Sequence, residues 1–267
     1  MKKVAISIPV HQSPDCVEEQ VRNIIKYVPN CVIVLHASKD DPNFINKLKP
    51  LINKYSSVLY INPYQFPTYA RAEAANVSKL SSVHASNIQY INSVVKDLDV
   101  MAFDTSNDMF VRKGIEKTFE EFDWGCNAVI RQDPSTFFDP GIINRLELVS
   151  PIKYVCKSAQ EGFWCNIGAA LYFANKIQEL EKLIKEPISS EEGTLANLVM
   201  NSGEIDIDKN SGTRYVFHDS SEGRSVAKSS ILKVRNGELP HVYSVKRVPR
   251  TFNHPTRLYV RELTKND

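Results

Sequence analysis

The sequence predicts an α/β fold with a Rossmann-like, mostly parallel sheet flanked by helices. Three short apolar runs rich in β-branched residues support this, at 4–10, 31–36 and 58–61. Amphipathic stretches separate the runs, and strands alternating with helical patterns are typical of a parallel sheet with right-handed crossovers. Such sheets bind ligands at the carboxyl ends of their strands. The polar residues after each run, among them His11 and Ser38, are therefore the first candidates for a site.

Helices are expected between these strands. Asp15 is placed to cap a helix over 16–27, and a second helix is expected through about residue 55. A further helix is expected within 77–97, because apolar residues recur there at helical spacing. The apolar run 99–103 then predicts a fourth strand. The first 110 residues thus form a regular half of the chain.

The half from 111 to 267 is less regular. Residues 135–149 are expected to be loop with a short helix, and 203–230, rich in Ser, Gly, Asp and Lys, are expected to be a mobile loop. Basic residues gather in 242–261. Helices are expected at about 114–122 and 174–184, and a shorter one at 191–201. With no internal repeat, the chain is predicted to be one domain.

Composition excludes several classes of protein. Of the 267 residues, 42% are hydrophobic and 24% charged, which is ordinary for a globular protein and unlike a disordered one. The net charge of +2 gives no general attraction to nucleic acid, so an anion site must be a local cluster. The five cysteines include no Cys-x-x-Cys pair, which argues against a zinc site or a disulfide framework and favours a reducing cytosol.

No segment is expected to cross a membrane. The apolar run at 4–10 is interrupted by Ser7 and Pro9 and is too short for a signal peptide. No uncharged run approaches the roughly 20 residues of a membrane span. A cytoplasmic protein is expected, with peripheral association at the inner face of the membrane as the alternative.

The first candidate site follows the predicted fourth strand. Its acids, Asp104 and Asp108, could hold Mg²⁺ or Mn²⁺ against a diphosphate, although their spacing differs from the Asp-x-Asp of metal-dependent sugar transferases. A second interpretation is a metal-free contact of Asp104 and Asn107 with a sugar or a ribose. A third is a turn in which these side chains cap backbone groups.

Two further segments contain clusters of like charge, one acidic and one basic. Adjacent carboxylates at Glu191 and Glu192 could supply a general base, or could favour the dipole of a helix that Ser190 caps. The cations Lys246, Arg247 and Arg250 could neutralise a diphosphate, or could form a solvated basic edge.

The segment 160–166 combines an aromatic ring with carboxyl and amide groups. Glu161 and Trp164 could hold a sugar ring, while the alternative for Trp164 is a place in the core. The sequence contains no GxGxxG, GxxxxGK[ST], HExxH or GxSxG motif. This argues against nicotinamide-binding, P-loop, zincin and serine-hydrolase functions.

Together these segments resemble the core-2/I-branching β-1,6-N-acetylglucosaminyltransferase family, in a short bacterial form. Residues 33–39 resemble the family's second strand with its His- or Asp-containing turn, and 82–87 resemble the start of a family helix. Residues 100–110 resemble the strand that ends at the sugar-nucleotide site. Residues 189–192 resemble the Ser-Pro-Asp-Glu segment that carries the family's base, and 242–247 resemble the segment whose Lys contacts the diphosphate.

The resemblance implies a GT-A-like single domain over 1–267, in which 1–110 bind the nucleotide sugar and 111–267 bind the acceptor and carry the catalysis. It implies an inverting hexosyltransferase that moves GlcNAc or another hexose from a nucleotide-diphosphate sugar, expected to be UDP-linked. The acceptor is a hydroxyl of a glycan or glycolipid, in bacterial surface polysaccharide or lipopolysaccharide synthesis. No cofactor is expected, and Mg or Mn is needed only if Asp104 and Asp108 bind it.

The resemblance also suggests roles for single residues. Glu192 is the expected base, although Gly193 follows it where the family has an aromatic residue. The family's further Arg matches either Arg224 or Arg235. The expected donor-binding residues are His11, Ser38, Asp104, Asn107, Lys246, Arg247 and Arg250, and the expected acceptor-binding residues are Glu161 and Trp164. The alternatives are a non-catalytic glycan- or nucleotide-binding protein of the same fold, and a metal-dependent nucleotidyl- or sugar-transferase.

Overall fold

A computed structural model describes the chain apart from short gaps. The residues outside it are 12, 40, 42, 66–68, 73–74, 79, 127–129, 134–139, 157–160, 185–190, 208–210 and 219–222. Within helices and strands, the side chains of 69–72, 75–78, 130–131, 140, 191–192 and 211 are also outside it.

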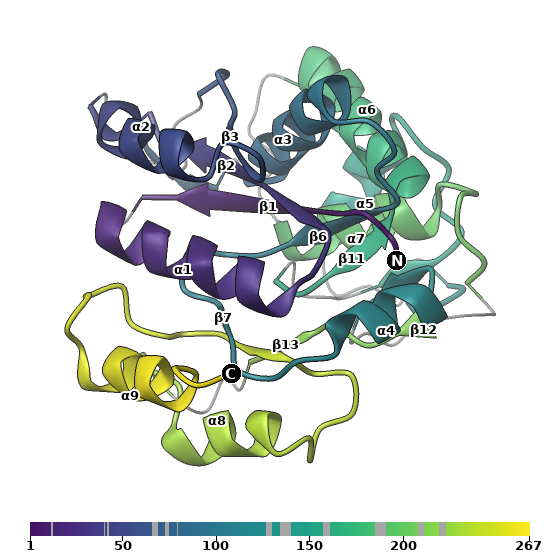
Figure 1. Ribbon diagram of the computed structural model, residues 1–267. Helices are drawn as coiled ribbons and strands as arrows, with labels where there is room; N and C mark the ends of the chain where they lie inside the picture. The colour runs from purple at the N-terminus through teal and green to yellow at the C-terminus, as the bar shows by residue number, and fades with distance from the viewer. Residues whose placement is uncertain are drawn as a thin grey trace.

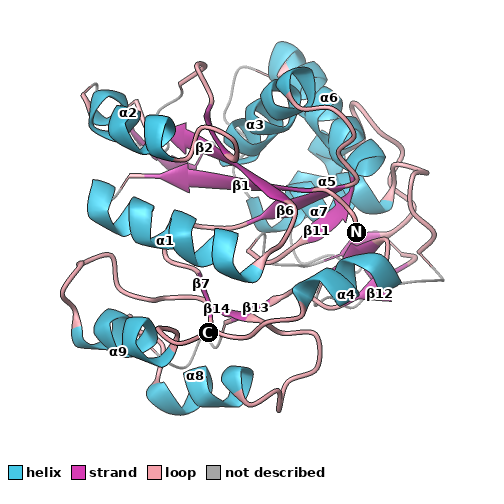
Figure 2. Cartoon of the chain, viewed as in Figure 1, coloured by secondary structure: helices cyan, strands magenta, loops and turns pink. Residues whose placement is uncertain are grey.

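The centre of the molecule is a seven-stranded sheet (Figures 1 and 2). Its order is β12 (Ser211–Gly212), β8 (Trp124–Gly125), β11 (Trp164–Asn166), β6 (Val100–Phe103), β1 (Val4–Val10), β2 (Cys31–Ala37) and β3 (Leu59–Ile61). Strands β6, β1, β2 and β3 are parallel, and Ser7 lies beside both Val34 and Phe103. Strand β11 is antiparallel to both of its neighbours. The predicted α/β fold with a mostly parallel sheet is confirmed.

Helices cover both faces of this sheet because side chains alternate along each strand. Ala5 and Met101 pack with α3 (Leu80–Val94), α5 (Pro140–Leu146), α6 (Ile167–Leu183) and α7 (Glu191–Met200). Ile6 and Ala102 face the other way, toward α1 (Pro14–Tyr27), α2 (Phe44–Lys54) and α4 (Ile115–Glu121). No helix in the described part of the chain is long and apolar enough to cross a membrane.

Three smaller sheets surround the main one. One joins β13 (Val216–Phe217), β14 (Ser244–Val245) and β7 (Met109–Phe110), and the others pair β9 (Ile130–Arg131) with β10 (Val155–Cys156) and β4 (Tyr69–Ala72) with β5 (Ala75–Ser78). Helices α8 (Lys228–Arg235) and α9 (Pro255–Leu263) form a separate core with β7 and β14, below α1 in Figure 1.

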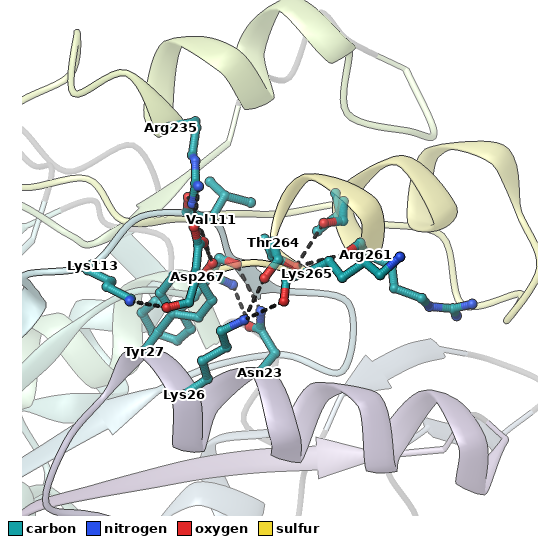
Figure 3. Close-up of polar contacts among 12 residues, drawn as sticks. Asn23, Lys26, Tyr27, Val111, Lys113, Arg235, Arg261, Thr264, Lys265 and Asp267 are labelled. Carbon is teal, nitrogen blue, oxygen red and sulfur yellow. Dashed lines mark hydrogen bonds and ion pairs between the residues drawn. The ribbon is translucent and has the colours of Figure 1, made fainter.

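Polar contacts fasten this separate core to helix α1 (Figure 3). The Arg235 guanidinium donates two hydrogen bonds to the Asp267 carboxylate, and the Tyr27 hydroxyl donates to the same group. The Arg235 hydrogen bonds hold the Asp267 pKa down, at about 2. On α1, the Lys26 ammonium donates to the Thr264 carbonyl oxygen at 2.6 Å. The chain after α9 is therefore held against α1.

The structure corrects several expected elements. The described part of 203–230 is not all loop, because it contains β12, β13 and the start of α8, and Tyr215 within it is fully buried. The basic segment 242–261 contains β14 and most of α9, which the His254 side chain caps. Helix α6 begins at Ile167 rather than near 174, because the Asn166 side chain accepts the Ala169 N–H at 2.9 Å.

Candidate functional site

Several predicted site residues lie at the carboxyl edge of the parallel strands. His11 follows β1, Ser38 follows β2 and Asp104 follows β6. The Ser38 N–H donates to the Val10 carbonyl at 3.2 Å, and the Asp104 N–H donates to the Ser7 carbonyl at 3.1 Å. Since parallel strands end at one edge, the fold brings these three positions to the same side of the sheet.

The loop after β6 is held in one conformation by its own side chains. The Asp108 carboxylate accepts the Thr105 N–H at 2.7 Å, and the Asn107 side chain accepts the Thr105 hydroxyl at 2.8 Å. From α1, the Gln20 amide donates to the Thr105 carbonyl at 2.7 Å and to the Asp108 carbonyl at 3.1 Å. These contacts match the turn interpretation of the acidic segment, but they do not provide a hydrogen bond for every carboxylate oxygen in it.

Two carboxylate oxygens in this loop are buried and have no hydrogen-bond partner among the described residues. One belongs to Asp104 and the other to Asp108. The second Asp104 oxygen accepts the Tyr215 hydroxyl at 2.6 Å. Burial, followed by the nearby Asp108 charge, raises the pKa of Asp104 well above its usual value, and burial raises the pKa of Asp108 to about 7. A proton or a cation would relieve the cost of burying these oxygens.

Lys246 and Glu161 form an ion pair beside these acids. Their side chains are 17% and 16% exposed. Burial raises the pKa of Glu161 and the Lys246 ammonium lowers it, with a net decrease, and Lys246 also opposes the rise of the Asp108 pKa. Lys246, predicted to bind the donor, therefore contacts Glu161, predicted to bind the acceptor.

Two residues of this cluster were not predicted from the sequence. Burial lowers the pKa of Arg214, and the Glu161 and Asp108 charges oppose this decrease. An Arg214 nitrogen donates to the His218 carbonyl at 3.2 Å. Burial, and then the Lys246 and Arg247 charges, lower the pKa of His218. The composition of 203–230 suggested loop, but the aromatic and β-branched residues Tyr215, Val216 and Phe217 are the signal that could have predicted a strand here.

The other two predicted cations differ in position. The Arg250 guanidinium donates to the Ser106 hydroxyl at 3.0 Å, so Arg250 lies on the acidic loop. The Arg247 side chain donates instead to the Gly223 carbonyl, from a backbone with a φ of 66°. Arg250 thus contacts the loop that carries Asp104 and Asp108, through Ser106.

Trp164 does not have the position expected of a sugar-binding platform. It is fully buried in β11, its ring packs edge-on against Phe119, and its N–H donates to the Thr213 carbonyl at 3.2 Å. An added methyl at Gly125 would collide with the indole. The acceptor-binding prediction for Trp164 is therefore wrong, because the side chain is fully buried and leaves no surface exposed to a sugar.

The side chain of Glu192, the expected base, lies outside the described residues, as do Ser189, Ser190 and Gln160. The backbone around it is described. Helix α7 begins at Glu191, and the Asn197 amide donates to the Gly193 carbonyl at 2.6 Å. The same amide exchanges two hydrogen bonds of 2.9 Å with the Cys156 backbone in β10. The first turn of α7 is therefore tied to β10.

Comparison with known proteins supports the fold. No family model and no curated protein matches the chain. Among solved structures, the crystal structure of an active-site mutant of LgtC, a glycosyltransferase, matches with a TM-score of 0.53 and 10% identity. The match covers 98% of this chain and 95% of that one. The likeness does not support the core-2 family specifically, and it shows that the chain has a GT-A-like glycosyltransferase fold.

Proposed function

We propose that this protein is an inverting glycosyltransferase that transfers a hexose, such as GlcNAc, from a UDP-linked sugar to a hydroxyl of a glycan or glycolipid. The observation that carries the proposal is the buried charged cluster of Asp104, Asp108, Glu161 and Lys246, at the carboxyl edge of a sheet with a glycosyltransferase fold. Sheets of this kind bind ligands at that edge.

The donor half of the reaction uses the cations and the acidic loop. Lys246, Arg247 and Arg250 stabilise the departing diphosphate, and Asp104 and Asn107 contact the donor sugar or the ribose. The contact of Arg250 with Ser106 supports this, since it holds one cation on the loop that follows β6. Fixed cations stabilise developing charge without reorganising during the reaction.

Glu192 is the proposed base. Its carboxylate takes the proton of the acceptor hydroxyl while that oxygen attacks the anomeric carbon, and the nucleoside diphosphate leaves from the opposite face with inversion. Contacts around α7 support this position. Strand β8 runs parallel to β6, so Cys126 follows it at the carboxyl edge, and its sulfur lies 3.9 Å from that of Cys156. The Asn197 amide donates hydrogen bonds to the carbonyl oxygens of both Cys156 and Gly193, and Gly193 is the residue after Glu192.

A metal-dependent transferase is the second candidate, and the two unpartnered oxygens of Asp104 and Asp108 favour it. Carboxylate oxygens suit Mg²⁺ or Mn²⁺, and such an ion would neutralise part of the diphosphate charge. The described residues contain no group of three or more His, Cys, Asp or Glu that could hold a metal. Asp104 and Asp108 would therefore supply the protein's share of the ligands, and the donor phosphates the rest.

The proposal also includes the predicted roles of the two halves of the chain and the predicted cellular role. Residues 1–110 bind the nucleotide sugar and 111–267 the acceptor, with Glu161 on the acceptor side. The protein acts in bacterial surface polysaccharide synthesis, in the cytoplasm or peripherally at the inner face of the membrane.

A transfer assay with and without EDTA separates the candidates. We expect UDP-sugar turnover that resists EDTA. Turnover that EDTA abolishes would favour the metal-dependent enzyme. Binding of nucleotide sugar or glycan without any turnover would favour the non-catalytic binding protein. The anomeric configuration of the product, read by NMR, tests inversion directly.

The role of Glu192 is tested by Glu192→Gln, with Glu191→Gln as the matched control. General-base catalysis contributes roughly 10²–10⁴-fold, so Glu192→Gln should lower kcat by that factor and leave UDP binding unchanged. The control alters the same helix terminus and should stay near the wild-type rate. Equal rates in the two variants would exclude Glu192, and a loss only in Glu191→Gln would move the base to Glu191.

A further inference from the structure

A groove lined by both polar and apolar side chains lies beside the end of β3, between α3 and α6. Its volume is about 610 Å³, within the range of small-molecule sites. Tyr64 lines it from the segment after β3, Gln89 and Tyr90 line it from α3, and Gln178 and Glu181 line it from α6. None of these residues belongs to the charged cluster described above.

The lining favours an uncharged ligand. Most of its described polar groups are hydroxyls and amides, Glu181 is the charged side chain, and neither lysine nor arginine is among them. A phosphate or a nucleotide would meet no cation here, in contrast to the cluster around Lys246. Amide and hydroxyl groups both donate and accept hydrogen bonds, which is the capacity that sugar hydroxyls require.

Contacts across the groove hold its polar groups in place. The Gln178 amide of α6 donates to the Gln89 side chain of α3, and the Ser82 hydroxyl donates to the Glu181 carboxylate. At the β3 end, the Asn62 side chain accepts the Tyr64 N–H at 2.9 Å. A preorganised lining loses less side-chain entropy when a ligand binds.

Tyr64 is unusual among the aromatic residues. Its side chain is 66% exposed, and every other aromatic side chain in the described part of the chain is buried or half-buried. A tyrosine ring offers an apolar face with a polar end, which suits the C–H face and the hydroxyls of a sugar ring. An exposed aromatic ring at the rim of a polar groove thus points to a saccharide.

Buried hydrogen bonds connect this groove to the acidic loop. The Asn62 amide donates to the Ser86 hydroxyl and to the Asn87 side chain, both at 2.9 Å. Asn87 in turn donates to the Ser7 hydroxyl at 2.8 Å, and the Ser7 carbonyl accepts the Asp104 N–H at 3.1 Å. The groove is therefore joined through a short, rigid path to the edge where the donor is proposed to bind.

We propose that the groove between α3 and α6 binds a neutral saccharide, a part of the acceptor glycan distant from the hydroxyl that receives the sugar. This inference rests on the proposed function in naming the ligand an acceptor. Saccharide binding itself can be measured without any transfer reaction.

The test measures binding by titration calorimetry and saturation-transfer NMR, with lactose and N,N′-diacetylchitobiose as neutral probes and UDP as the anionic probe. We expect Tyr64→Ala to weaken binding of the neutral probe at least tenfold and to leave UDP binding unchanged. Gln178→Ala should act in the same direction. Leu183→Ala, an exposed change on the same helix outside the groove, is the control and should change neither.

The failure of this inference differs from the failure of the proposed function. Binding of neither disaccharide to the wild-type protein, or equal binding by Tyr64→Ala, would overturn the saccharide site even if UDP-sugar turnover is observed. Saccharide binding that depends on Tyr64, without turnover, would keep the site and exclude the enzyme. Where turnover occurs, Tyr64→Ala should raise the acceptor KM and leave the donor KM unchanged.

Discussion

Two buried charged clusters in this protein differ in how well their charges are paired. In the first, both oxygens of Glu19 on α1 bind guanidinium groups of α9, one from the fully buried Arg257 and one from Arg261. In the second, Asp104 and Asp108 each keep a buried oxygen without a partner among the described residues. In the first cluster both carboxylate oxygens are paired, although one Arg257 nitrogen is buried without a partner among the described residues. In the second cluster each carboxylate keeps an unpartnered oxygen and its desolvation cost.

This difference separates a structural role from a functional one. A buried carboxylate whose partners are in place contributes to the folded state, and removing a partner is costly. A buried carboxylate with a strongly shifted pKa and one oxygen left without a partner is typical of a ligand or catalytic site. The two clusters are also connected, because Arg257 donates to the Pro249 carbonyl at 2.8 Å, next to Arg250 of the site. The cluster of Glu19, Arg257 and Arg261 therefore helps to position the segment around Arg250, which contacts the acidic loop.

The largest expected effect comes from breaking the paired cluster. Glu19→Ala leaves Arg257 buried without its carboxylate and should lower the free energy of unfolding by about 3–5 kcal/mol. Glu18→Ala is the matched control, since Glu18 is the adjacent residue and pairs with the exposed Lys54. It should cost about 0–1 kcal/mol. Urea denaturation measures both, and equal losses would contradict the structural role of Glu19.

Removing the cation of the functional cluster should affect binding. Lys246→Ala should weaken UDP binding by about 1.5–3 kcal/mol, the usual contribution of a hydrogen bond to a charged group. The same change leaves Glu161 unpaired, so stability should fall as well. Adding Glu161→Gln should restore the stability but not the UDP affinity, measured by calorimetry. Full affinity in Lys246→Ala would make Lys246 a structural partner of Glu161 only.

The buried Asp108 carboxylate should make the free energy of unfolding depend on pH. Because the folded pKa of Asp108 is raised from 3.8 to about 7, the folded state keeps a proton that the unfolded chain releases. The free energy of unfolding should therefore decrease as the pH rises from about 4 to 7. Asp108→Asn should flatten this decrease, with a gain on the order of 1–2 kcal/mol at pH 8. Parallel curves for the two proteins would mean that Asp108 is already charged in the folded state.

The regular sheet could be predicted from the sequence, but the cluster of Glu19, Arg257 and Arg261 could not. Strand β1 begins and ends as expected, because a central parallel strand is a continuous apolar run bounded by polar residues. Helix α9 was not predicted, since the segment 242–261 was described only by its basic residues. Among these residues are Arg257 and Arg261. Their carboxylate partner is Glu19, more than 230 residues earlier in the chain. Local patterns carry no signal for such a contact.

The site shows the same limit. Asp104, Glu161 and Lys246 were recognised by residue type, and the fold brings them together. Tyr215, which binds Asp104, was missed because a polar, Ser-rich composition surrounds it. Trp164 was misassigned since an indole near a carboxylate looks alike in sequence whether it is buried or exposed. Only packing, through Phe119 and β8, decided its position.

The smallest expected effect concerns the charged contact between Arg235 and Asp267. This pair is partly open to solvent, and Asp267 is more exposed than the carboxylates of Glu19, Asp104 and Asp108. Since the folded pKa of Asp267 is lowered from 3.8 to about 2, its contribution is present above pH 4 and is lost as the pH falls through about 2. Asp267→Asn should cost about 1 kcal/mol at pH 7, after allowance for screening, and only a small part of that near pH 2. Glu262→Gln, in an exposed pair with Lys265, is the control and should change stability by less at every pH. If the cost of Asp267→Asn persisted at pH 2, packing against Tyr27 rather than charge would hold this segment to α1.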